Sequence, residues 1–357
     1  MSARFHSLTV AAVEHITDDA VAITFEVPEE LGETYRYLPG QHVALRCTIA
    51  GDDVRRNYSI CAPATTGVLR VGVKRLPGGV FSGYACERLR PGDTIEVLTP
   101  AGRFTTLMDP AHAKHYAAIA AGSGITPILS IIATALEVEP DSRATLLYAN
   151  RTARSIMFLE ELEDLRDRYL GRLDILYLLD EETREVDLLS GVLDGGRLGR
   201  ILDTLLPVAS VDEWFLCGPQ GLVDTAREAL LAHGVDPGHV HRELFLASTA
   251  PSAPSAAPPA AVSTAEGARA TVRLDGRSTV VSVHGSSTLL DAVLPVRPDA
   301  PFACKGGVCG TCRARLVAGT VDMAQNHALE AVEVAEGYVL ACQSRPTSES
   351  VVLDFDA

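Results

Sequence analysis

At 357 residues the chain is too long for one ordinary hydrophobic core, and we expect two or three domains. The formal net charge of −15 argues against nucleic-acid binding, which requires a basic surface, and leaves room for a partner with a basic docking patch. No long apolar segment of the signal-peptide kind follows Met1, so we expect a cytoplasmic protein in which the cysteines stay reduced.

Residues 1–108 contain short strand-like segments, among them 21–27, 43–49 and 69–74. Turn signals separate them, such as Pro39–Gly40 and Pro91–Gly92. Many short strands at this spacing predict an antiparallel β-barrel.

Residues 109–247 alternate between strand-like and helix-like segments. Strands are expected at 116–120, 144–148, 173–178 and 213–217, and helical spacing covers 155–170. This alternation predicts a parallel α/β sheet. Within it, residues 117–136 carry no charge and are long enough to span a membrane. The glycines and the proline inside that stretch favour a buried strand, a turn and a buried helix instead.

Residues 248–267 consist mainly of Ser, Ala, Pro and Thr, with Glu266 as the one acid. Such a composition buries too little apolar surface to fold, and it predicts a flexible linker through which the last domain could swing. Residues 268–357 then form a third domain, beginning with strand-like segments at 270–274 and 278–283.

Four cysteines dominate the third domain. Cys304, Cys309 and Cys312 have the spacing C-x4-C-x2-C, and Cys342 follows downstream. This is the plant-type arrangement of thiolates around a [2Fe–2S] cluster, a one-electron carrier. Zinc is the alternative, but a zinc site usually pairs C-x2-C with a second such pair, which the sequence lacks. Glycines between the cysteines let the loop curl and direct backbone N–H groups at sulfur.

Two segments of the predicted barrel could hold a flavin. After one strand come Arg56, Tyr58 and Ser59, which could bind a pyrophosphate, cover an aromatic ring and reach a ring nitrogen. A basic edge strand with a tyrosine is the simpler alternative. Downstream, the turn and short helix at 78–82 could cradle a phosphate with backbone N–H groups.

Three strand ends of the α/β domain could hold a nucleotide. Residues 122–127 form a Gly-rich turn that Thr126 can cap, although a well-capped helix alone would explain it. No acid lies at 149–155, where Arg151 and Ser155 follow a strand, and this favours NADPH over NADH. Cys217 could flank a nicotinamide or be a buried cysteine in a tight turn. The acid and the aromatic residue at 241–245 could meet a flavin, but packing is favoured there.

Together these motifs resemble the ferredoxin–NADP⁺ reductase superfamily, with domains in the order of the reductase components of multicomponent oxygenases. Segments 150–158, 302–313 and 337–343 are most similar to the reductase subunits of phenylacetyl-CoA epoxidases, which act in phenylacetate degradation. Reductases of ketosteroid, alkane and aromatic hydroxylases share this layout. A non-catalytic redox sensor is a further alternative, but no output domain is visible.

The resemblance implies a six-stranded FAD barrel, an NAD(P) domain and a β-grasp [2Fe–2S] domain. It implies that NADPH, or NADH, reduces FAD, that the cluster takes the electrons singly, and that an oxygenase, a di-iron epoxidase above all, receives them. Ser59 near the flavin N5 and Cys217 near the nicotinamide take the catalytic positions. The implied cofactor-binding residues are Arg56, Asn57, Tyr58, Ser59, Gly79, Val80, Ser82, Gly122, Thr126, Arg151, Ser155 and Cys217. The implied cluster ligands are Cys304, Cys309, Cys312 and Cys342.

Overall fold

The structure, a computed structural model, describes residues 4–206, 208–245 and 267–357. The chain divides into two compact units: one holds residues 7–54 and 58–247, the other holds 1–6, 55–57 and 248–357. The predicted linker at 248–267 lies, apart from Gly267, outside the described residues. The predicted domain boundaries after 108 and 247 stay predictions.

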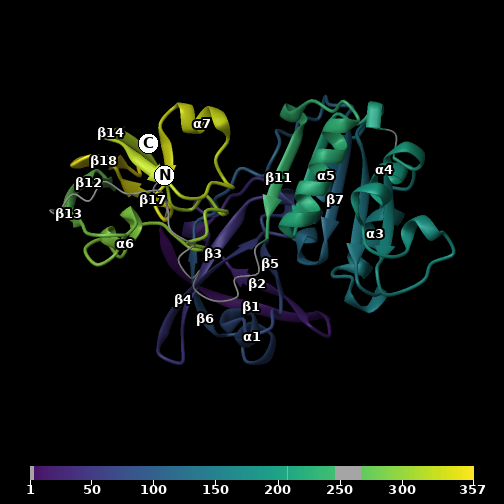
Figure 1. The fold of residues 1–357 in the computed structure, drawn as a ribbon. Coiled ribbons are helices and arrows are strands. Elements are labelled where there is room, and N and C mark those ends of the chain that lie inside the picture. Colours follow the sequence, from purple (N-terminus) through teal and green to yellow (C-terminus); the bar gives the residue numbers. More distant parts are fainter. Residues whose placement is uncertain (1–3, 207, 246–266) are drawn as a thin grey trace. The chain divides into compact units, whose positions relative to one another are not determined.

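The first part of the chain forms a six-stranded sheet in the order β4–β3–β6–β1–β2–β5 (Figure 1). An isolated bridge between Ile60 and Val71 joins the two edges, and Cys61 N–H donates to Arg70 O (2.9 Å) beside it. Alternating apolar residues of β5 point into a core that they share with β2 and β3. The elements are β1 (Phe5–Thr17), β2 (Ala20–Glu26), β3 (His42–Ile49), β4 (Asp52–Ser59), β5 (Leu69–Lys74), α1 (Val80–Glu87) and β6 (Thr94–Leu98). The predicted antiparallel barrel is confirmed.

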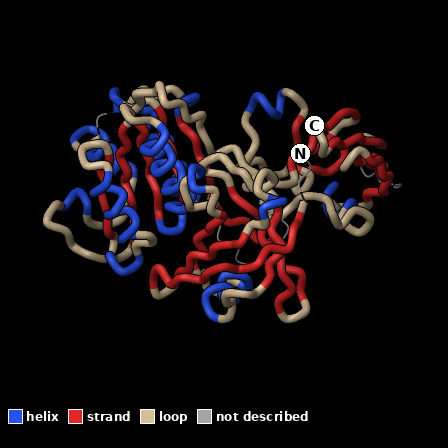
Figure 2. Tube along the Cα trace, turned by 180° about the vertical axis from the view of Figure 1, so that it is seen from behind, coloured by secondary structure: helices blue, strands red, loops and turns tan. Residues whose placement is uncertain are grey.

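The second part forms a wholly parallel sheet in the order β11–β10–β7–β8–β9, with helices packed against it (Figures 1 and 2). Its first strand, β7, lies between β10 and β8, so the strand order reverses there. In open α/β sheets ligands bind at such a switch point, beside the carboxyl ends of the strands. The elements are β7 (His115–Ala121), α2 (Ile125–Val138), β8 (Arg143–Asn150), α3 (Leu159–Arg168), β9 (Leu173–Leu179), α4 (Gly195–Thr204), β10 (Glu213–Gly218), α5 (Gln220–Ala232) and β11 (Val240–Leu244).

Two sequence expectations for this sheet can be compared with the structure. The uncharged stretch becomes β7, a 3-10 turn at Gly122–Gly124 and the buried helix α2, as predicted. No described helix is long and apolar enough to cross a membrane. Helix α3 begins at Leu159 rather than near 155, because Phe158 adopts a left-handed φ of +59° that interrupts the helix.

Helix α2 joins the barrel to the α/β sheet. It is buried along nearly its whole length. Ser130 Oγ donates to Ala62 O (2.7 Å), and Ala64 N–H donates to Thr134 Oγ1 (2.9 Å). The barrel and the sheet therefore meet through directed hydrogen bonds as well as apolar packing.

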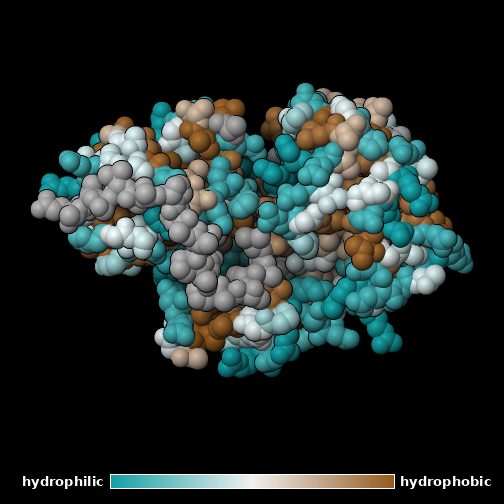
Figure 3. Space-filling view, viewed as in Figure 1, coloured by the Kyte–Doolittle hydropathy of each residue, from teal (hydrophilic) through white to brown (hydrophobic). Residues whose placement is uncertain are grey.

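The last part of the chain forms a mixed sheet in the order β13–β12–β18–β14–β16, in which β12 and β18 run parallel. Helix α6 packs on it through Leu289, Leu290 and Val293, which gives the predicted β-grasp fold. The elements are β12 (Ala268–Leu274), β13 (Arg277–Val283), α6 (Leu289–Val293), β14 (Arg313–Ala318), β15 (Val321–Met323), α7 (Ala331–Ala335), β16 (Tyr338–Leu340), β17 (Ser344–Pro346) and β18 (Ser350–Asp354). On the face drawn in Figure 3, hydrophilic residues cover most of the described surface and apolar residues lie scattered between them.

Candidate functional site

Three side chains meet where the barrel faces the carboxyl ends of β10 and β11. Cys217 and Glu243 lie opposite each other in the parallel register. Ser59, at the end of β4, donates from Oγ to Glu243 Oε2 (3.1 Å). Burial, with Glu243 nearby, raises the pKa of the Cys217 thiol well above its ordinary value. Cys217 is therefore a neutral thiol here, suited to packing against a flat ring rather than to nucleophilic chemistry.

A buried histidine lies beside Glu243. His42 Nδ1 lies 3.8 Å from Glu243 Oε1, and His42 Nε2 is buried without a hydrogen-bond partner. The ring is confined on one side, because a Cβ added to Gly102 would approach Nδ1 to 2.8 Å. Glu243 is thus flanked by a hydroxyl at one oxygen and by an imidazole at the other.

Two glycines permit close approaches around the turn at 122–124, one inside the α/β sheet and one between the barrel and helix α2. A Cβ on Gly124 would lie 2.2 Å from Cys217 O, so only glycine fits between the turn and β10. A Cβ on Gly72 of β5 would lie 2.6 Å from Thr126 Cγ2. Thr126 Oγ1 donates to Ser123 O (3.0 Å) and fixes the turn, while Gly122 has a φ of +52° and open space around it.

The predicted flavin residues of β4 and α1 differ in their surroundings. Tyr58 is half-buried, with its ring centroid 5.3 Å from that of Phe81. Arg56 is half-buried and donates to Arg55 O (2.7 Å). Asn57 keeps a buried Oδ1 without a hydrogen-bond partner. In a separate turn, Val80 is exposed.

The hydroxyl of Ser82 is used locally. Leu76 N–H donates to Ser82 Oγ (3.1 Å), which itself lies 3.4 Å from Gly79 O. A Cβ on Gly79 would approach Ser82 Oγ to 2.3 Å, so this turn requires glycine. Ser82 therefore holds the shape of the turn through its own hydroxyl.

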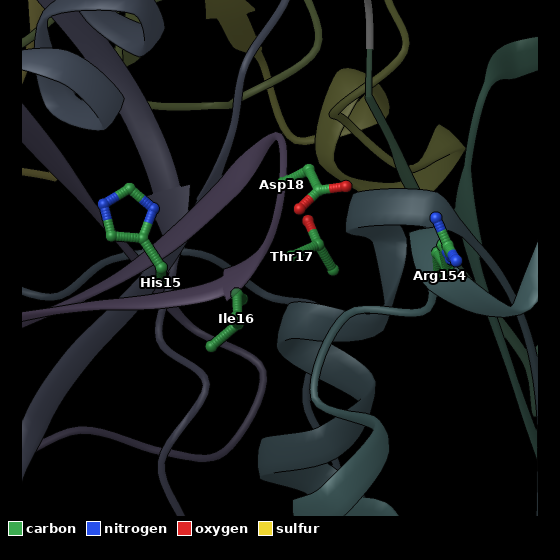
Figure 4. A pocket seen from close by; sticks show the side chains of 5 residues that line it. All are labelled: His15, Ile16, Thr17, Asp18 and Arg154. Atoms are coloured by element: carbon green, nitrogen blue, oxygen red, sulfur yellow. The ribbon is translucent and has the colours of Figure 1, made fainter.

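The predicted adenosine residues follow β8. Arg151 is exposed and its guanidinium lies 3.8 Å from Asp19 Oδ2 of the barrel. Ser155 Oγ accepts from Thr152 N–H (3.1 Å) and donates to Thr152 O (2.8 Å), so it closes a capping box. An open pocket of about 620 Å³ adjoins them, lined by residues 15–18 of the β1–β2 hairpin and by Arg154 (Figure 4).

The four cysteines of the last domain gather in two pairs. Cys304 shares a hydrogen bond with Cys309, and Cys312 shares one with Cys342. The contact with Cys309, together with backbone N–H groups that outweigh the effect of burial, lowers the pKa of the Cys304 thiol. Two thiolates for each of two iron ions is the requirement of a [2Fe–2S] cluster. Among the described residues, no group of three or more His, Cys, Asp or Glu could hold a single metal ion.

The polar atoms at these sites fit the cofactors that the sequence implies. Buried nitrogen and oxygen atoms normally have hydrogen-bond partners. Those of His42 Nε2, Asn57 Oδ1 and both amide atoms of Asn150 have none within the protein. Asn150 ends β8, beside the predicted adenosine residues. Such atoms are where the polar groups of a bound cofactor would complete the hydrogen bonding.

Sequence reasoning missed His42 and Gly72, and it gave Glu243 no hydrogen-bond partner. For residues 241–245 the sequence favoured a packing role. Phe245 does pack on the hydrophobic core, whereas Glu243 accepts a hydrogen bond from Ser59. A glycine inside an otherwise β-branched strand signals close backbone approach, and this could have pointed to Gly72. Nothing local to residue 42 marks His42.

Comparisons with known families cover each part of the chain. Residues 7–106 match the oxidoreductase FAD-binding domain family, and residues 118–228 match the oxidoreductase NAD-binding domain family. Residues 272–347 match the 2Fe-2S iron-sulfur cluster binding domain family.

Similar proteins match this chain over nearly its whole length. The chain is 45% identical to one of the subunits of 1,2-phenylacetyl-CoA epoxidase of Escherichia coli (strain K12), over 99% of this chain and 98% of that protein. It is 38% identical to the ferredoxin reductase component of 3-ketosteroid-9-alpha-monooxygenase of Mycobacterium tuberculosis (strain ATCC 25618 / H37Rv), over 98% and 95% of the two chains. Among solved structures, phthalate dioxygenase reductase aligns with a TM-score of 0.58 and 25% identity, over 98% of both chains.

Proposed function

Because this chain belongs to the ferredoxin–NADP⁺ reductase superfamily, as an NAD(P)H oxidoreductase of the kind that serves multicomponent oxygenases, we propose that its partner is a phenylacetyl-CoA epoxidase. The chain carries electrons from NAD(P)H through FAD and a [2Fe–2S] cluster to an oxygenase. The epoxidase, a di-iron enzyme of phenylacetate degradation, is the finer proposal. A cytoplasmic location stays a prediction.

The observation that carries the finer proposal is the extent of the likeness to the epoxidase protein. Identity of 45% extends over 99% of this chain. Identity to the ketosteroid monooxygenase reductase, with the same domain order, is 38%. That second likeness makes a ketosteroid hydroxylase the second candidate partner.

The proposed flavin site is the barrel edge around Ser59. Arg56 and the backbone at Gly79 and Val80 would hold the FAD phosphates, Asn57 would contribute its unpartnered oxygen, and Tyr58 would cover the ring. When bound, FAD supplies the conversion of one hydride into two single electrons. Ser59 Oγ donates its one proton to Glu243, so it would face the reacting edge as an acceptor and would relay a proton from there to the carboxylate.

The proposed nucleotide site is the switch point of the sheet. The Gly122 turn and Thr126 would receive the nucleotide phosphates, and the neutral Cys217 would pack against the nicotinamide. The close approach at Gly72 would bring this edge to the barrel, and that at Gly124 would hold the turn against β10, so that together they would exclude water. Cys304, Cys309, Cys312 and Cys342 would hold the cluster, which supplies one-electron transfer.

A reconstitution experiment tests the proposed partner. Purified holoprotein is combined with the purified oxygenase component of phenylacetyl-CoA epoxidase or with a ketosteroid hydroxylase, and product is measured together with NAD(P)H consumption. We expect coupled product formation with the epoxidase, and cytochrome c reduction without either oxygenase. Cytochrome c reduction together with product only from the ketosteroid hydroxylase would refute the epoxidase proposal and leave the reductase activity intact.

A further inference from the structure

Two carboxylates lie at the segment that follows β8, one beside Arg151 and one at Ala153. Asp19, in the turn of the β1–β2 hairpin, accepts from Thr17 Oγ1 (2.8 Å) and lies 3.5 Å from Lys74 Nζ and 3.8 Å from Arg151 Nη2. It therefore brings a negative charge from the barrel to the residue that follows β8. Figure 4 shows the same hairpin, at Thr17 and Asp18, facing the loop that carries Arg154.

The second carboxylate comes from the loop after β9. Glu182 Oε1 accepts from Ala153 N–H (3.0 Å), two residues beyond Arg151. The preceding residue, Glu181, donates its N–H to Arg151 O (2.9 Å). This backbone contact holds the loop against residues 151–153, so the Glu182 charge stays where an adenosine-bound group would arrive.

The same strand end has an open hydrogen-bonding position. Asn150, immediately before Arg151, is 6% exposed, and neither its Nδ2 nor its Oδ1 makes a hydrogen bond of good geometry, although the amide lies beside the Tyr148 hydroxyl. The end of the second strand of such a sheet is where the adenine ribose of a dinucleotide lies. Ser155, in contrast, uses its hydroxyl in the capping box.

We propose that Asp19 and Glu182 are specificity-determining residues of the nucleotide site, and that their carboxylates weaken binding of an adenosine 2′-phosphate relative to a 2′-hydroxyl. The inference rests on the proposed nucleotide site. At Arg151, a 2′-phosphate would bind a guanidinium whose charge Asp19 already partly balances. The Glu182 carboxylate, held at Ala153, would also repel it. A neutral 2′-hydroxyl meets no such repulsion, so these two acids, which lie outside residues 149–155, oppose the NADPH preference that the sequence predicts.

The test compares binding of two adenosine fragments by isothermal titration calorimetry. The FAD- and cluster-loaded full-length protein is titrated with 2′,5′-ADP and with 5′-AMP. The variants Asp19→Asn and Glu182→Gln keep an acceptor oxygen at each position and remove only the charge. We expect each substitution to lower the Kd of 2′,5′-ADP by about five-fold, which is the order expected for removing one charge a few ångströms away in a water-like medium. The Kd of 5′-AMP should change less than two-fold.

The matched control is Glu185→Gln, which removes one exposed charge from the same loop. A general gain of positive potential favours 2′,5′-ADP slightly, because this fragment carries one more phosphate than 5′-AMP, and Glu185→Gln measures that general effect. The change in the ratio of the two Kd values should be clearly larger in Asp19→Asn and Glu182→Gln than in this control. As a second readout, the ratio of kcat/KM for NADPH to that for NADH, with ferricyanide as acceptor, should rise by more in the first two variants than in the control.

Two results would overturn the inference, and they are distinguishable. If wild type binds both fragments and the ratio of their Kd values stays the same in both variants, the carboxylates do not discriminate, although the nucleotide site stands. If wild type reduces ferricyanide with neither NADPH nor NADH, the proposed nucleotide site itself is wrong.

Discussion

Glu243 is the residue whose chemistry the fold changes most. On its own strand it is an ordinary acid near a domain end, yet the Ser59 hydroxyl and the His42 imidazole lie at its two oxygens. A carboxylate within hydrogen-bond reach of a hydroxyl can take up the proton that the hydroxyl passes on. Each hydride that leaves as two electrons leaves one proton behind, and at the proposed flavin site this pair would take it up.

Replacing Glu243 by Gln tests that role. The substitution keeps a hydrogen bond to Ser59 and removes the group that can accept a proton. We expect kcat for ferricyanide reduction to fall by about 10²-fold, the lower range for loss of general acid–base catalysis, with KM for NAD(P)H within about two-fold of wild type. Stopped-flow and steady-state kinetics measure both. Glu96→Gln, in a surface pair with Arg46, is the control; an unchanged kcat in Glu243→Gln would exclude the proton role.

At this scale the sequence predicts the residues that lie in local motifs. The cysteine spacing indicates the cluster because three of the four cysteines lie in one loop. Ser59 and Glu243 are 184 positions apart, and they meet only because β4 of the barrel ends against β11 of the sheet. No local pattern encodes such a pairing. No local pattern marks His42 either, because it lies at the start of β3 and meets Glu243 only near the end of β11.

Among the elements, helix α2 depends on a buried acid at its end. Glu139 follows the helix with its side chain fully buried. Its carboxylate accepts from Tyr116 OH (2.8 Å) and Ser142 Oγ (2.7 Å), and from Asp109 N–H (3.1 Å). Burial alone would raise the pKa of Glu139, but these hydrogen bonds outweigh it and hold the pKa below its ordinary value of 4.5.

A lowered folded-state pKa fixes the sign of the pH dependence. The stability that Glu139 contributes is fully present above about pH 4.5 and is lost as the pH falls through the lowered folded pKa. We expect Glu139→Gln to lower the free energy of unfolding by about 2–4 kcal/mol at pH 7, and to flatten the acid side of the Tm–pH curve. Calorimetry of the holoprotein between pH 3 and 7 measures this. Asp141→Asn, at an exposed neighbour, should do neither.

The periodicity of the sequence predicts the individual strands and helices better than it predicts how they are arranged. Alternating strands and helices predict the parallel sheet, since a crossover helix must cover its face. The sequence did not predict that the β1–β2 hairpin would reach the loop after β8, where Asp19 lies beside Arg151. That contact joins the barrel to the sheet, and the charges involved are too exposed for any hydrophobic pattern to reveal it.

For the whole molecule, the two halves of the electron route can be separated by one substitution. Cys309→Ser removes one of the proposed cluster ligands and changes no residue of the unit that holds residues 7–54 and 58–247. We expect NAD(P)H oxidation by ferricyanide to stay within about two-fold of wild type, while reduction of cytochrome c and of the oxygenase is lost with the cluster absorbance. Cys86→Ser, in the barrel, is the control. Full cytochrome c reduction without the cluster would contradict the proposed route.

The swing hypothesis also belongs at this scale, and it rests on the composition of 248–267 alone. Shortening this segment to a few residues should lower turnover with the oxygenase and leave ferricyanide reduction unchanged. Both rates are measured on the same preparation. Unchanged oxygenase turnover would show that the cluster domain needs no such freedom.

The end of β11 determines where the chain leaves the parallel sheet. Phe245 N–H donates to Gly218 O (2.9 Å), so the chain leaves the sheet at the edge that carries Cys217 and Glu243. Any carrier fused after this point is tethered beside the proposed flavin and nicotinamide site. Its effective concentration there is set by the tether, on the order of millimolar for short flexible ones, and not by its abundance in bulk. Chimeras that exchange the carrier at this junction should therefore retain fast internal transfer, even with a carrier that binds the reductase weakly as a separate protein.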